Sequence, residues 1–384
     1  MASRAARRSR QRRRRRRTLL AVGALLAVVA AAAVAALVTR TDDSPAVAPA
    51  ADTTTSSSTV ATTTTTPRDP RRGNGQPVVF AFGGDVHFEG TVRTKLLADP
   101  ASVFADAAPV LSAADVAVVN LETAITESTG ALVKEWVFKA PASAIDALRA
   151  GGIDAASMAN NHGIDYGAQG LADSLLVRAA TQYPILGIGA NATEAYTPLR
   201  LDVKGQRIAV FAATDVMGEE FVSTWTATDT QAGMASTKYD AEARMVAAIQ
   251  AVRPEVDTIA VMLHWGVERT DCPSPRQQAL ARTLVDAGAD IVVGSHAHHL
   301  LGGGRLGTAF VDYGLGNFAF FNEAGEYGRT GILVVTATGR DTDSYQWVPA
   351  RIRSGSPVPF APGPDADAEV AHWNELRACT DLTP

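Results

Sequence analysis

The sequence predicts an α/β fold, because apolar runs of strand character alternate with alanine-rich stretches of helical character from about residue 77 onward. Runs such as 258–263 are apolar on both faces, which is typical of parallel strands that are covered on both sides. In addition, polar side chains follow one apolar run after another, where open α/β sheets build their functional sites. A chain of 384 residues can hold two average domains or one large α/β domain.

Each expected strand corresponds to a short apolar run, and each expected helix corresponds to a longer alanine-rich stretch. The expected strands are 77–82, 115–120, 154–158, 185–189, 207–213, 257–263, 290–294, 308–313 and 331–337. The expected helices are 101–112, 142–151, 167–180, 239–252 and 275–288. No internal repeat of fixed period accompanies this order, so the sequence favours one α/β domain over an array of repeats.

The first 40 residues differ sharply in composition from the rest of the chain. Residues 1–17 form an arginine-rich head, and residues 18–38 are 21 positions without a charge. An uncharged apolar stretch of this length can span a bilayer as a helix, and flanking arginines keep their own side in the cytoplasm. We therefore expect a single-pass transmembrane signal anchor at 18–38, with the rest of the chain outside the cell membrane. A cleaved signal peptide, with small residues at 46–51 as its cleavage site, is the alternative and would give a secreted form.

Three further segments follow the expected anchor. Residues 39–76 are rich in Thr, Ser and Pro, with few large apolar side chains, and are expected to form a disordered linker. The folded domain is expected at 77–355. The tail at 356–384 is expected either to pack as a short helix near residues 372–377 or to stay mobile.

The formal net charge of −5 hides a strong asymmetry between the head and the remainder. Without residues 1–40, which hold eleven arginines and no acid, 24 basic residues stand against 40 acidic ones, a formal charge of −16. An arginine run can bind nucleic acid, but its place directly before a spanning segment favours membrane topology, so no nucleic-acid partner is expected. The two cysteines, Cys272 and Cys379, form either a disulfide in an exported domain or two separate thiols.

Six polar clusters follow the expected strands, and they carry six of the seven histidines. Residues i and i+2 of an extended segment face the same way, so Asp85 and His87 can aim a carboxylate and an imidazole at one point. Asn120 and Glu122 have the same spacing after the next strand. The other four clusters contain Asn161 and His162; His264, Trp265 and Glu268; His296, His298 and His299; and Asn317.

Imidazole, carboxylate and carboxamide groups together suit divalent transition metals. A dinuclear site needs about this set of groups: one carboxylate shared by two ions, imidazoles on both ions, and open positions for substrate. Each cluster alone has a simpler explanation, such as a buried core histidine at His264 or a helix-capping side chain at Asn161. Their recurrence at successive strand ends favours a metal site.

The order of these motifs resembles the CapA family of capsule or poly-γ-glutamate synthesis proteins, within the calcineurin-like metallophosphatase superfamily. The resemblance covers roughly residues 77–350. The motifs are Gly-Asp-x-His, Asn-Leu-Glu, Asn-Asn-His, His-Trp-Gly-x-Glu, Gly-x-His-x-His and Tyr-x-Leu-Gly-Asn-Phe. The resemblance implies a four-layer α/β sandwich of metallophosphatase type, in which two central mixed sheets are flanked by helices and the metal site lies at their carboxyl edge.

The resemblance also implies a role for each candidate residue. His162 matches the histidine that binds no metal and either protonates the leaving group or stabilises its charge. Glu122 stands where the superfamily usually has a bridging Asp, and this departure puts ordinary phosphoesterase activity in doubt. The residues implied to support the ligands or line the pocket are Asn120, Trp265, Glu268 and Asn317. The implied ligands of two divalent ions (Mn, Fe or Zn) are Asp85, His87, Glu122, Asn161, His264, His296 and His298.

For function, the resemblance implies a part in capsule or poly-γ-glutamate synthesis or export, as a dinuclear-metal hydrolase of phosphoester or amide bonds. The implied substrate is an anionic polymer or a phosphoester, and the implied partner is a poly-γ-glutamate synthase complex. Two alternatives stay open: a non-catalytic metal-binding scaffold of an envelope polymer synthase complex, and an unrelated exported metallophosphoesterase or nucleotidase. The acidic domain argues against simple electrostatic capture of an acidic polymer, although bound cations would locally reverse the sign.

Overall fold

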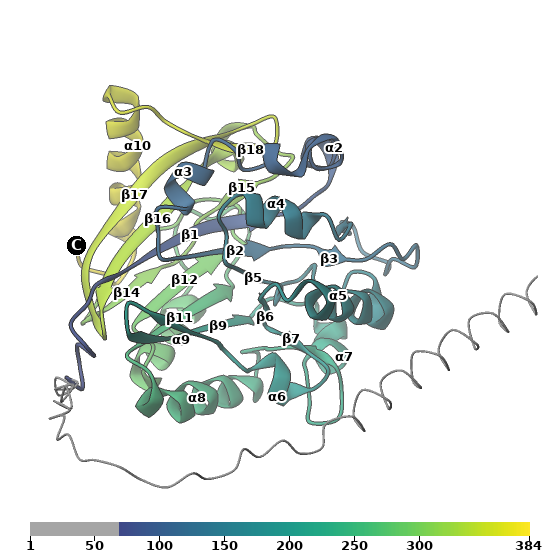
Figure 1. Cartoon of the computed structure of the whole chain (residues 1–384), viewed down its shortest axis with the longest axis horizontal. Coiled ribbons are helices and arrows are strands. Elements are labelled where there is room, and N and C mark those ends of the chain that lie inside the picture. Colours follow the sequence, from purple (N-terminus) through teal and green to yellow (C-terminus); the bar gives the residue numbers. More distant parts are fainter. Residues whose placement is uncertain (1–68) are drawn as a thin grey trace, which may run out of the picture. The chain divides into compact units, whose positions relative to one another are not determined.

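The computed structural model describes residues 69–384 (Figure 1). The expected head at 1–17, the expected anchor at 18–38 and most of the expected linker lie outside the described residues. Within residues 69–384, no helix combines the length and the apolar character that crossing a membrane requires. The membrane anchor therefore stays a prediction from the sequence.

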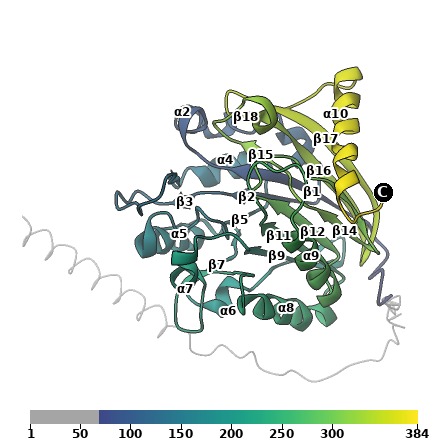
Figure 2. The ribbon, with the colours of Figure 1, turned by 180° about the vertical axis from the view of Figure 1, so that it is seen from behind.

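Two mixed β-sheets form the centre of the described domain (Figures 1 and 2). Four neighbouring strands of each sheet run parallel, β1, β2, β5 and β6 in one and β9, β11, β12 and β14 in the other. The larger sheet has the order β18 (Ser356–Pro359), β17 (Asp341–Arg353), β16 (Arg329–Thr338), β1 (Val78–Val86), β2 (Val116–Leu121), β5 (Ala155–Ser157) and β6 (Ile185–Leu186), with β15 (Asn317–Ala319) paired to β1. The smaller sheet has the order β13 (Gly303–Leu306), β14 (Ala309–Asp312), β12 (Ile291–Ser295), β11 (Thr258–His264), β9 (Gln206–Thr214) and β8 (Leu199–Val203). Two short ribbons lie apart from them, β3 (Ala124–Ile125) with β4 (Lys139–Ala140), and β7 (Ile188–Gly189) with β10 (Gly233–Met234).

Helices cover the outer face of each sheet. The larger sheet is covered by α2 (Gly90–Ala98), α3 (Ala108–Leu111), α4 (Ala144–Ala150) and α5 (Gly167–Thr181). The smaller sheet is covered by α6 (Ala192–Ala195), α8 (Ala241–Val252) and α9 (Pro275–Ala287). The remaining helices are α7 (Val222–Trp225) and α10 (Pro364–Glu375), and the 3₁₀ turns are η1 (Pro100–Ser102), η2 (Glu219–Phe221), η3 (Arg253–Glu255), η4 (Gly325–Gly328) and η5 (Leu376–Cys379).

Strand β11 shows why the sequence pattern leads to four layers. Val261 and Leu263 face the helices on the outer side of the smaller sheet, whereas Ala260 and Met262 face the core between the two sheets. Because successive side chains of a strand point to opposite faces, a run that is apolar at every position must be covered on both sides. The helix–sheet–sheet–helix arrangement confirms the four-layer α/β sandwich that the family resemblance implied.

Helix α9 illustrates how local sequence sets the boundaries of these elements. Ser274 caps its N-terminus by accepting a hydrogen bond from Gln277 N, while Gln277 bonds back to Ser274 N, and Pro275 occupies the first turn. Gly288 ends the helix with a φ of +119°, a conformation that favours glycine. Leu280 and Leu284 lie one turn apart and are fully buried against the smaller sheet.

Two expected elements are divided in the structure. The expected strand at 185–189 forms two short strands, β6 and β7, because Gly187 between them has a φ of +78°. The expected helix at 101–112 forms the turn η1 and the short helix α3. Pro109 fits only the first turn of a helix, so α3 begins at Ala108 and cannot continue from an earlier one.

The domain also continues beyond its expected boundary at residue 355. Strand β18 pairs with β17, and α10 lies along β17 in both views (Figures 1 and 2). Trp373 of α10 is 1% exposed, and its ring stacks on Trp347 with 5.5 Å between the centroids. Residues 356–384 are therefore part of the fold and not a mobile tail, because burial of a large aromatic ring holds them there.

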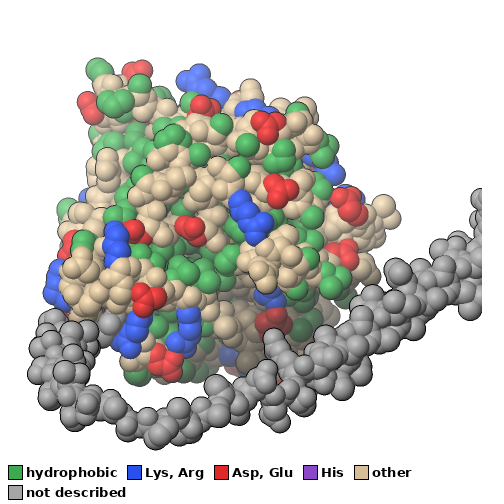
Figure 3. Space-filling view, viewed as in Figure 1, with side chains coloured by type: hydrophobic (Ala, Val, Ile, Leu, Met, Phe, Trp, Pro, Cys, Tyr) green, Lys and Arg blue, Asp and Glu red, His purple; other side chains and the backbone are tan. Residues whose placement is uncertain are grey.

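The first described residues are also attached to the domain, although the linker was expected to reach residue 76. Arg72 forms ion pairs with Asp341 and Asp343 at 3.1 and 3.2 Å. Gln206 donates hydrogen bonds from Nε2 to the carbonyl oxygens of Arg72 and Gln76. The described fold thus begins before residue 77. On the face shown in Figure 3, basic and acidic side chains are interspersed.

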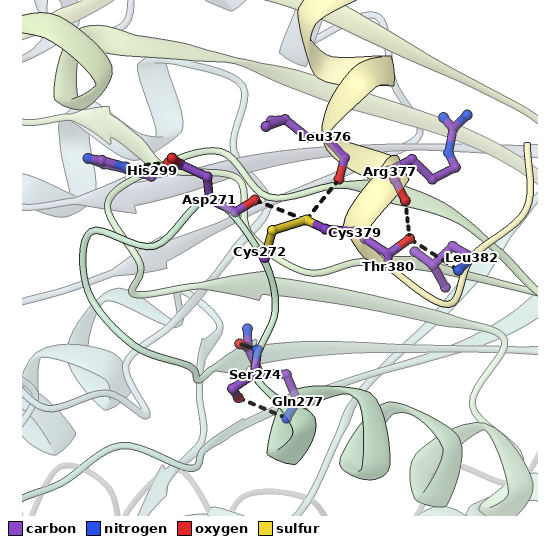
Figure 4. The surroundings of a disulfide bond; sticks show 10 residues. All are labelled: Asp271, Cys272, Ser274, Gln277, His299, Leu376, Arg377, Cys379, Thr380 and Leu382. Carbon is purple, nitrogen blue, oxygen red and sulfur yellow. Dashed lines mark hydrogen bonds and ion pairs between the residues drawn. A yellow bond between two sulfur atoms is a disulfide. The ribbon is translucent and has the colours of Figure 1, made fainter.

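Cys272 and Cys379 form a disulfide whose Cα atoms are 5.7 Å apart (Figure 4). The bridge joins the loop between β11 and α9 to the end of the chain, over a sequence separation of 107 residues. A cross-link that closes a loop of this length stabilises a fold by roughly 4–5 kcal/mol in the chain-entropy model. The adjacent Asp271 is 2.9 Å from His299 Nδ1, so the disulfide also fixes a loop beside one of the candidate histidines.

Candidate metal centre

Five predicted ligands meet at the carboxyl ends of strands from both sheets. Asp85 lies near the end of β1, and Glu122 follows directly after β2. His264 ends β11, and the loop after β12 carries His296 and His298. All five are buried or nearly so, with the side chain of His298 the most exposed at 12%. The shared direction of the parallel strands brings these side chains to one edge.

A bulge in β1 aims Asp85 at this edge. The pairing of β1 with β2 shifts between Gly83 and Asp85, so Gly84 has no partner in the ladder. An added Cβ on Gly84 would lie only 1.9 Å from the carbonyl oxygen of Gly316. Only glycine allows this close approach of two backbones, which explains the Gly-Asp of the sequence motif.

The ligand atoms form two overlapping groups. Glu122, His264 and His296 form one, and Asp85, Glu122 and His298 form the other, with the ligand atoms in each group within 4.8 Å of one another. Glu122 belongs to both groups, which is the position of a carboxylate shared by two ions. Asn161 joins the first group, because its Oδ1 is 2.6 Å from His264 Nε2.

The carboxylate of Glu122 carries the strongest sign that cations belong here. Glu122 is fully buried, and neither of its oxygens has a hydrogen-bond partner among the described residues. Burial, reinforced by the nearby Asp85, raises the pKa of Glu122 well above its ordinary value. A buried carboxylate without donors is costly unless a cation compensates it, so these residues fit the binding of divalent cations.

The imidazoles of the cluster fit metal binding in complementary ways. Burial lowers the pKa values of His264 and His296 well below the ordinary value, which keeps both rings neutral and their lone pairs available. His296 Nδ1 has no hydrogen-bond partner among the described residues. Burial also acts to lower the pKa of His298, but the charges of Glu122 and Asp85 outweigh it and raise the pKa to about 9. The two carboxylates beside His298 thus favour positive charge at this position.

Backbone strain accompanies the ligand loop after β12. His296 has a φ of +98° and His298 has a φ of +57°, both in the region that favours glycine. His296 N donates a hydrogen bond to Asp85 Oδ2 at 3.1 Å, which helps to hold the loop in place. Such conformations persist only where surrounding contacts enforce them, and they concentrate at functional sites.

Asn120 and Asn317 position the ligands without belonging to either group. Asn120 Nδ2 donates to Asp85 Oδ1 at 2.8 Å and lies 3.0 Å from His264 Nδ1. Asn317 Oδ1 lies 2.8 Å from His298 Nδ1. Each amide thus fixes the orientation of a neighbouring candidate ligand.

His87 lies beside the cluster but outside both groups, so this geometry does not support its expected role as a ligand. Its Nδ1 accepts a hydrogen bond from Glu89 N at 3.0 Å, and its Nε2 is 3.3 Å from Phe321 N. Its ring packs against Phe138 and Phe320, with centroids 4.7 and 4.0 Å away. Both ring nitrogens thus lie near backbone amides, and the role of His87 as a ligand stays a prediction from the sequence.

His162 reaches the cluster from the loop after β5. Its Nε2 lies 3.9 Å from Glu122 Oε1, while its Nδ1 lies 2.6 Å from Asp165 Oδ2. Burial lowers the pKa of His162, and the hydrogen bond to Asp165 opposes that effect. The ring of Phe138 stacks on His162 with 4.2 Å between the centroids. This pairing of a buried carboxylate with an imidazole fixes the direction of Nε2.

Asp165 and Lys134 belong to the site but were not identified from the sequence. Asp165 lies three residues after His162 in the segment Asn-His-x-x-Asp, a spacing that could have indicated the pairing. Lys134 bonds to Asp165 from the loop between β3 and β4. Its sequence surroundings, an apolar stretch with scattered charges, gave no signal of this contact.

A cavity of about 190 Å³ opens over the cluster and is lined by His162, His298 and a group of aromatic side chains. Glu268 lines this cavity, as expected of a pocket residue. Trp265 does not line it, so a supporting role beside the ligands stays a prediction for this residue. Its ring is fully buried in the core, stacks on Tyr313 and donates from Nε1 to Tyr313 O at 2.9 Å.

The sequence is similar to known proteins over most of this domain. The family model described as bacterial capsule synthesis protein PGA_cap matches residues 79–322. The capsule biosynthesis protein CapA of Bacillus anthracis is 32% identical over 216 residues, which cover 56% of this chain and 52% of that protein. The PGA biosynthesis protein CapA of Bacillus subtilis is 29% identical over 261 residues, covering 67% of each. The chain thus spans about half the length of the first relative and two thirds of the second.

Two more proteins are similar to parts of this chain. A probable polyglutamine synthesis accessory protein of Mycobacterium tuberculosis is 28% identical over 193 residues, 49% of this chain and 51% of that protein. The sulfate thiohydrolase SoxB of Thermus thermophilus aligns at 15% identity with a TM-score of 0.39, covering 76% of this chain and 45% of that one. The strand order and the hydrophobic cores, and not this similarity, define the fold. Because the family model extends from the strand that bears Asp85 to just past Asn317, the chain belongs to the bacterial capsule synthesis protein family PGA_cap.

Proposed function

We propose that this chain acts in capsule or poly-γ-glutamate synthesis or export as a dinuclear-metal hydrolase. The observation that carries the proposal is the carboxylate of Glu122, which is fully buried, has no donor among the described residues and belongs to both ligand groups. Names of relatives that refer to capsule, PGA and polyglutamine synthesis support the biological context. The bond cleaved is either a phosphoester bond or an amide bond. The substrate is either an anionic polymer or a small phosphoester.

The residues of the chain support hydrolysis as follows. Asp85, Glu122, Asn161, His264, His296 and His298 would hold two divalent ions, with mixed nitrogen and oxygen ligands that suit Mn, Fe or Zn. Such ions supply Lewis acidity and make water a better nucleophile near neutral pH. In hydrolysis, water adds to phosphorus or to a carbonyl carbon, and the departing oxygen or nitrogen requires a proton. His162 Nε2 faces the cluster and delivers that proton from the imidazolium form, whose positive charge Asp165 stabilises.

The full chain, purified and reconstituted with Mn²⁺, is expected to bind about two ions and to hydrolyse a member of a panel of phosphoester and γ-glutamyl substrates. Metal content is measured by mass spectrometry, and hydrolysis by product release before and after chelation. A folded chain that binds no metal would contradict the proposed site. A chain that binds two ions, hydrolyses nothing and still supports polymer production would instead be the metal-binding scaffold.

We also propose that the domain lies outside the cell membrane, anchored by residues 18–38. The disulfide between Cys272 and Cys379 supports this location, because such bonds persist in oxidising compartments. Protease added to intact cells should digest the domain, whereas a cytoplasmic control protein should survive. A domain that stays protected until the cells are lysed would contradict the proposed topology.

A further inference from the structure

The loop between β3 and β4, residues 126–138, lies across one side of the candidate centre and is called the β3–β4 loop here. Phe138 at its end covers the imidazoles of His162 and His87. Trp136 of the same loop lines the cavity over the cluster and is 56% exposed. The loop therefore forms part of the wall that substrate must pass.

Three residues of the β3–β4 loop are bonded to Asp165. Phe138 N donates to Asp165 Oδ2 at 2.7 Å, and Leu132 N donates to the carbonyl oxygen of Asp165 at 2.8 Å. Lys134 Nζ donates to Asp165 Oδ1 and, at 2.5 Å, to the carbonyl oxygen of Asn161. Asp165 thus joins the β3–β4 loop to His162, because the same carboxylate accepts from the imidazole.

Lys134 is distinct among these contacts because it carries a charge. Asp165 is fully buried, and its other side-chain partner is the imidazole of His162. Within residues 69–384, Lys134 is the one permanent cation that bonds to Asp165. A buried carboxylate is stabilised by a paired cation, and loss of one partner leaves the other uncompensated. The side chain of Lys134 is itself only 17% exposed and lies 5.2 Å from the ring centroid of Trp225.

We propose that Lys134 is a positioning residue that fastens the β3–β4 loop to Asp165 and thereby holds the imidazole of His162 toward Glu122. Loss of the ammonium group frees the loop and leaves the carboxylate of Asp165 able to rotate. That rotation alters the hydrogen bond that orients His162. This proposal rests on the proposed function for its kinetic consequence, whereas its structural consequence is measurable without any substrate.

Lys139 provides a matched control for Lys134. It lies at the start of β4, and its Nζ donates to the carbonyl oxygen of Ser128 at 2.8 Å, so it also ties down the β3–β4 loop. Its ammonium group lies 5.2 Å from the ring centroid of Tyr166 and forms no ion pair with Asp165. Lys134→Met and Lys139→Met therefore each remove one ammonium group that holds the β3–β4 loop, and only the first contacts Asp165.

The first test uses the full chain, reconstituted with Zn²⁺, and needs no substrate. In Lys134→Met, amide hydrogen exchange across 126–138 should rise by about tenfold or more, since two backbone donors of the loop lose their fixed acceptor. The low-field proton signal of His162 Nδ1 should shift or broaden. Lys134→Arg should restore both, and Lys139→Met should change exchange only near Ser128. Unchanged exchange and an unchanged imidazole signal in Lys134→Met would overturn the proposal.

The second test uses whichever substrate the parent chain hydrolyses. Lys134→Met should lower kcat by about ten- to a hundredfold, the usual result of slight misplacement of a reacting group, with KM and metal content little changed. Combining Lys134→Met with His162→Ala should give no further loss, because both act through one imidazole. Additive losses would overturn the proposed route through His162. If the parent chain hydrolyses nothing, the proposed function fails, while the exchange and proton measurements still decide the role of Lys134.

Discussion

Replacement of Glu122 by glutamine should strip the chain of both cations and lower any hydrolytic rate by roughly three orders of magnitude or more. Glutamine keeps the size of the side chain but cannot supply an anionic oxygen to each of two ions. Glu122 is the residue that the two ligand groups share, so its loss acts on both at once. Metal content after reconstitution, measured alongside the rate, tests the shared role directly.

A charge-matched control separates this effect from a general change in charge. Glu255 is exposed, pairs with Arg200 at 2.6 Å and lies outside both ligand groups. Glu255→Gln should therefore keep wild-type metal content and rate. If Glu122→Gln retained one tightly bound ion and lost the other, Glu122 would serve a single ion. If it retained both, the shared-carboxylate interpretation would be wrong.

In the metal-free chain, Glu122→Gln should stabilise the fold at alkaline pH relative to the parent chain. Burial raises the pKa of Glu122, so folding favours its protonated form. The stability that this proton confers is present at acidic pH and is lost as pH rises through the raised folded-state pKa. Glutamine is neutral at every pH, and the free energy of unfolding of the metal-free Glu122→Gln chain should therefore fall less toward alkaline pH. Denaturant titrations of the two metal-free chains across pH measure this difference.

The fold could be predicted largely from the sequence because its strands are covered on both faces. A run such as that of β11 is apolar at every position, and polar residues at its end mark the carboxyl edge. The two expected elements that the structure divides were mispredicted because each division depends on a single residue. Gly187 divides an expected strand, and Pro109 divides an expected helix. The C-terminal segment was left open because its order comes from contact between Trp373 and Trp347, which lie on separate elements.

The candidate site shows a similar limit. The meeting of Asp85 and His264 could be predicted from their places at strand ends, because the parallel strands of the two sheets bring both residues to one edge. The position of His87 could not be predicted, since it depends on the amide of Glu89 and on neighbouring aromatic rings. Asp165 and Lys134 were missed because a side chain from a loop meets another loop there. Sequence periodicity carries information about strands and helices, and none about such contacts.

Replacement of Asn161 by alanine and replacement of its neighbour His162 by alanine should impair different properties of the chain, metal binding in the first and turnover in the second. Asn161 Oδ1 points to His264 Nε2 within one ligand group, so Asn161→Ala should lower metal occupancy and activity together. His162 bonds to Asp165 and lies 3.9 Å from Glu122, so His162→Ala should leave metal content near the wild-type value. Its turnover should fall by roughly two to four orders of magnitude, the span usual for general acid catalysis.

Substrates that differ in their leaving group then identify what His162 does. A good leaving group departs with little protonation, so the loss in His162→Ala should shrink as the leaving group improves, whereas the loss in Asn161→Ala should not. Rates for a series of aryl esters with the two reconstituted variants measure this contrast. If His162→Ala loses as much metal as Asn161→Ala, His162 is a ligand. A loss that is the same for every leaving group would instead assign His162 to stabilising charge in the cluster, because a proton donor matters most when the leaving group is poor.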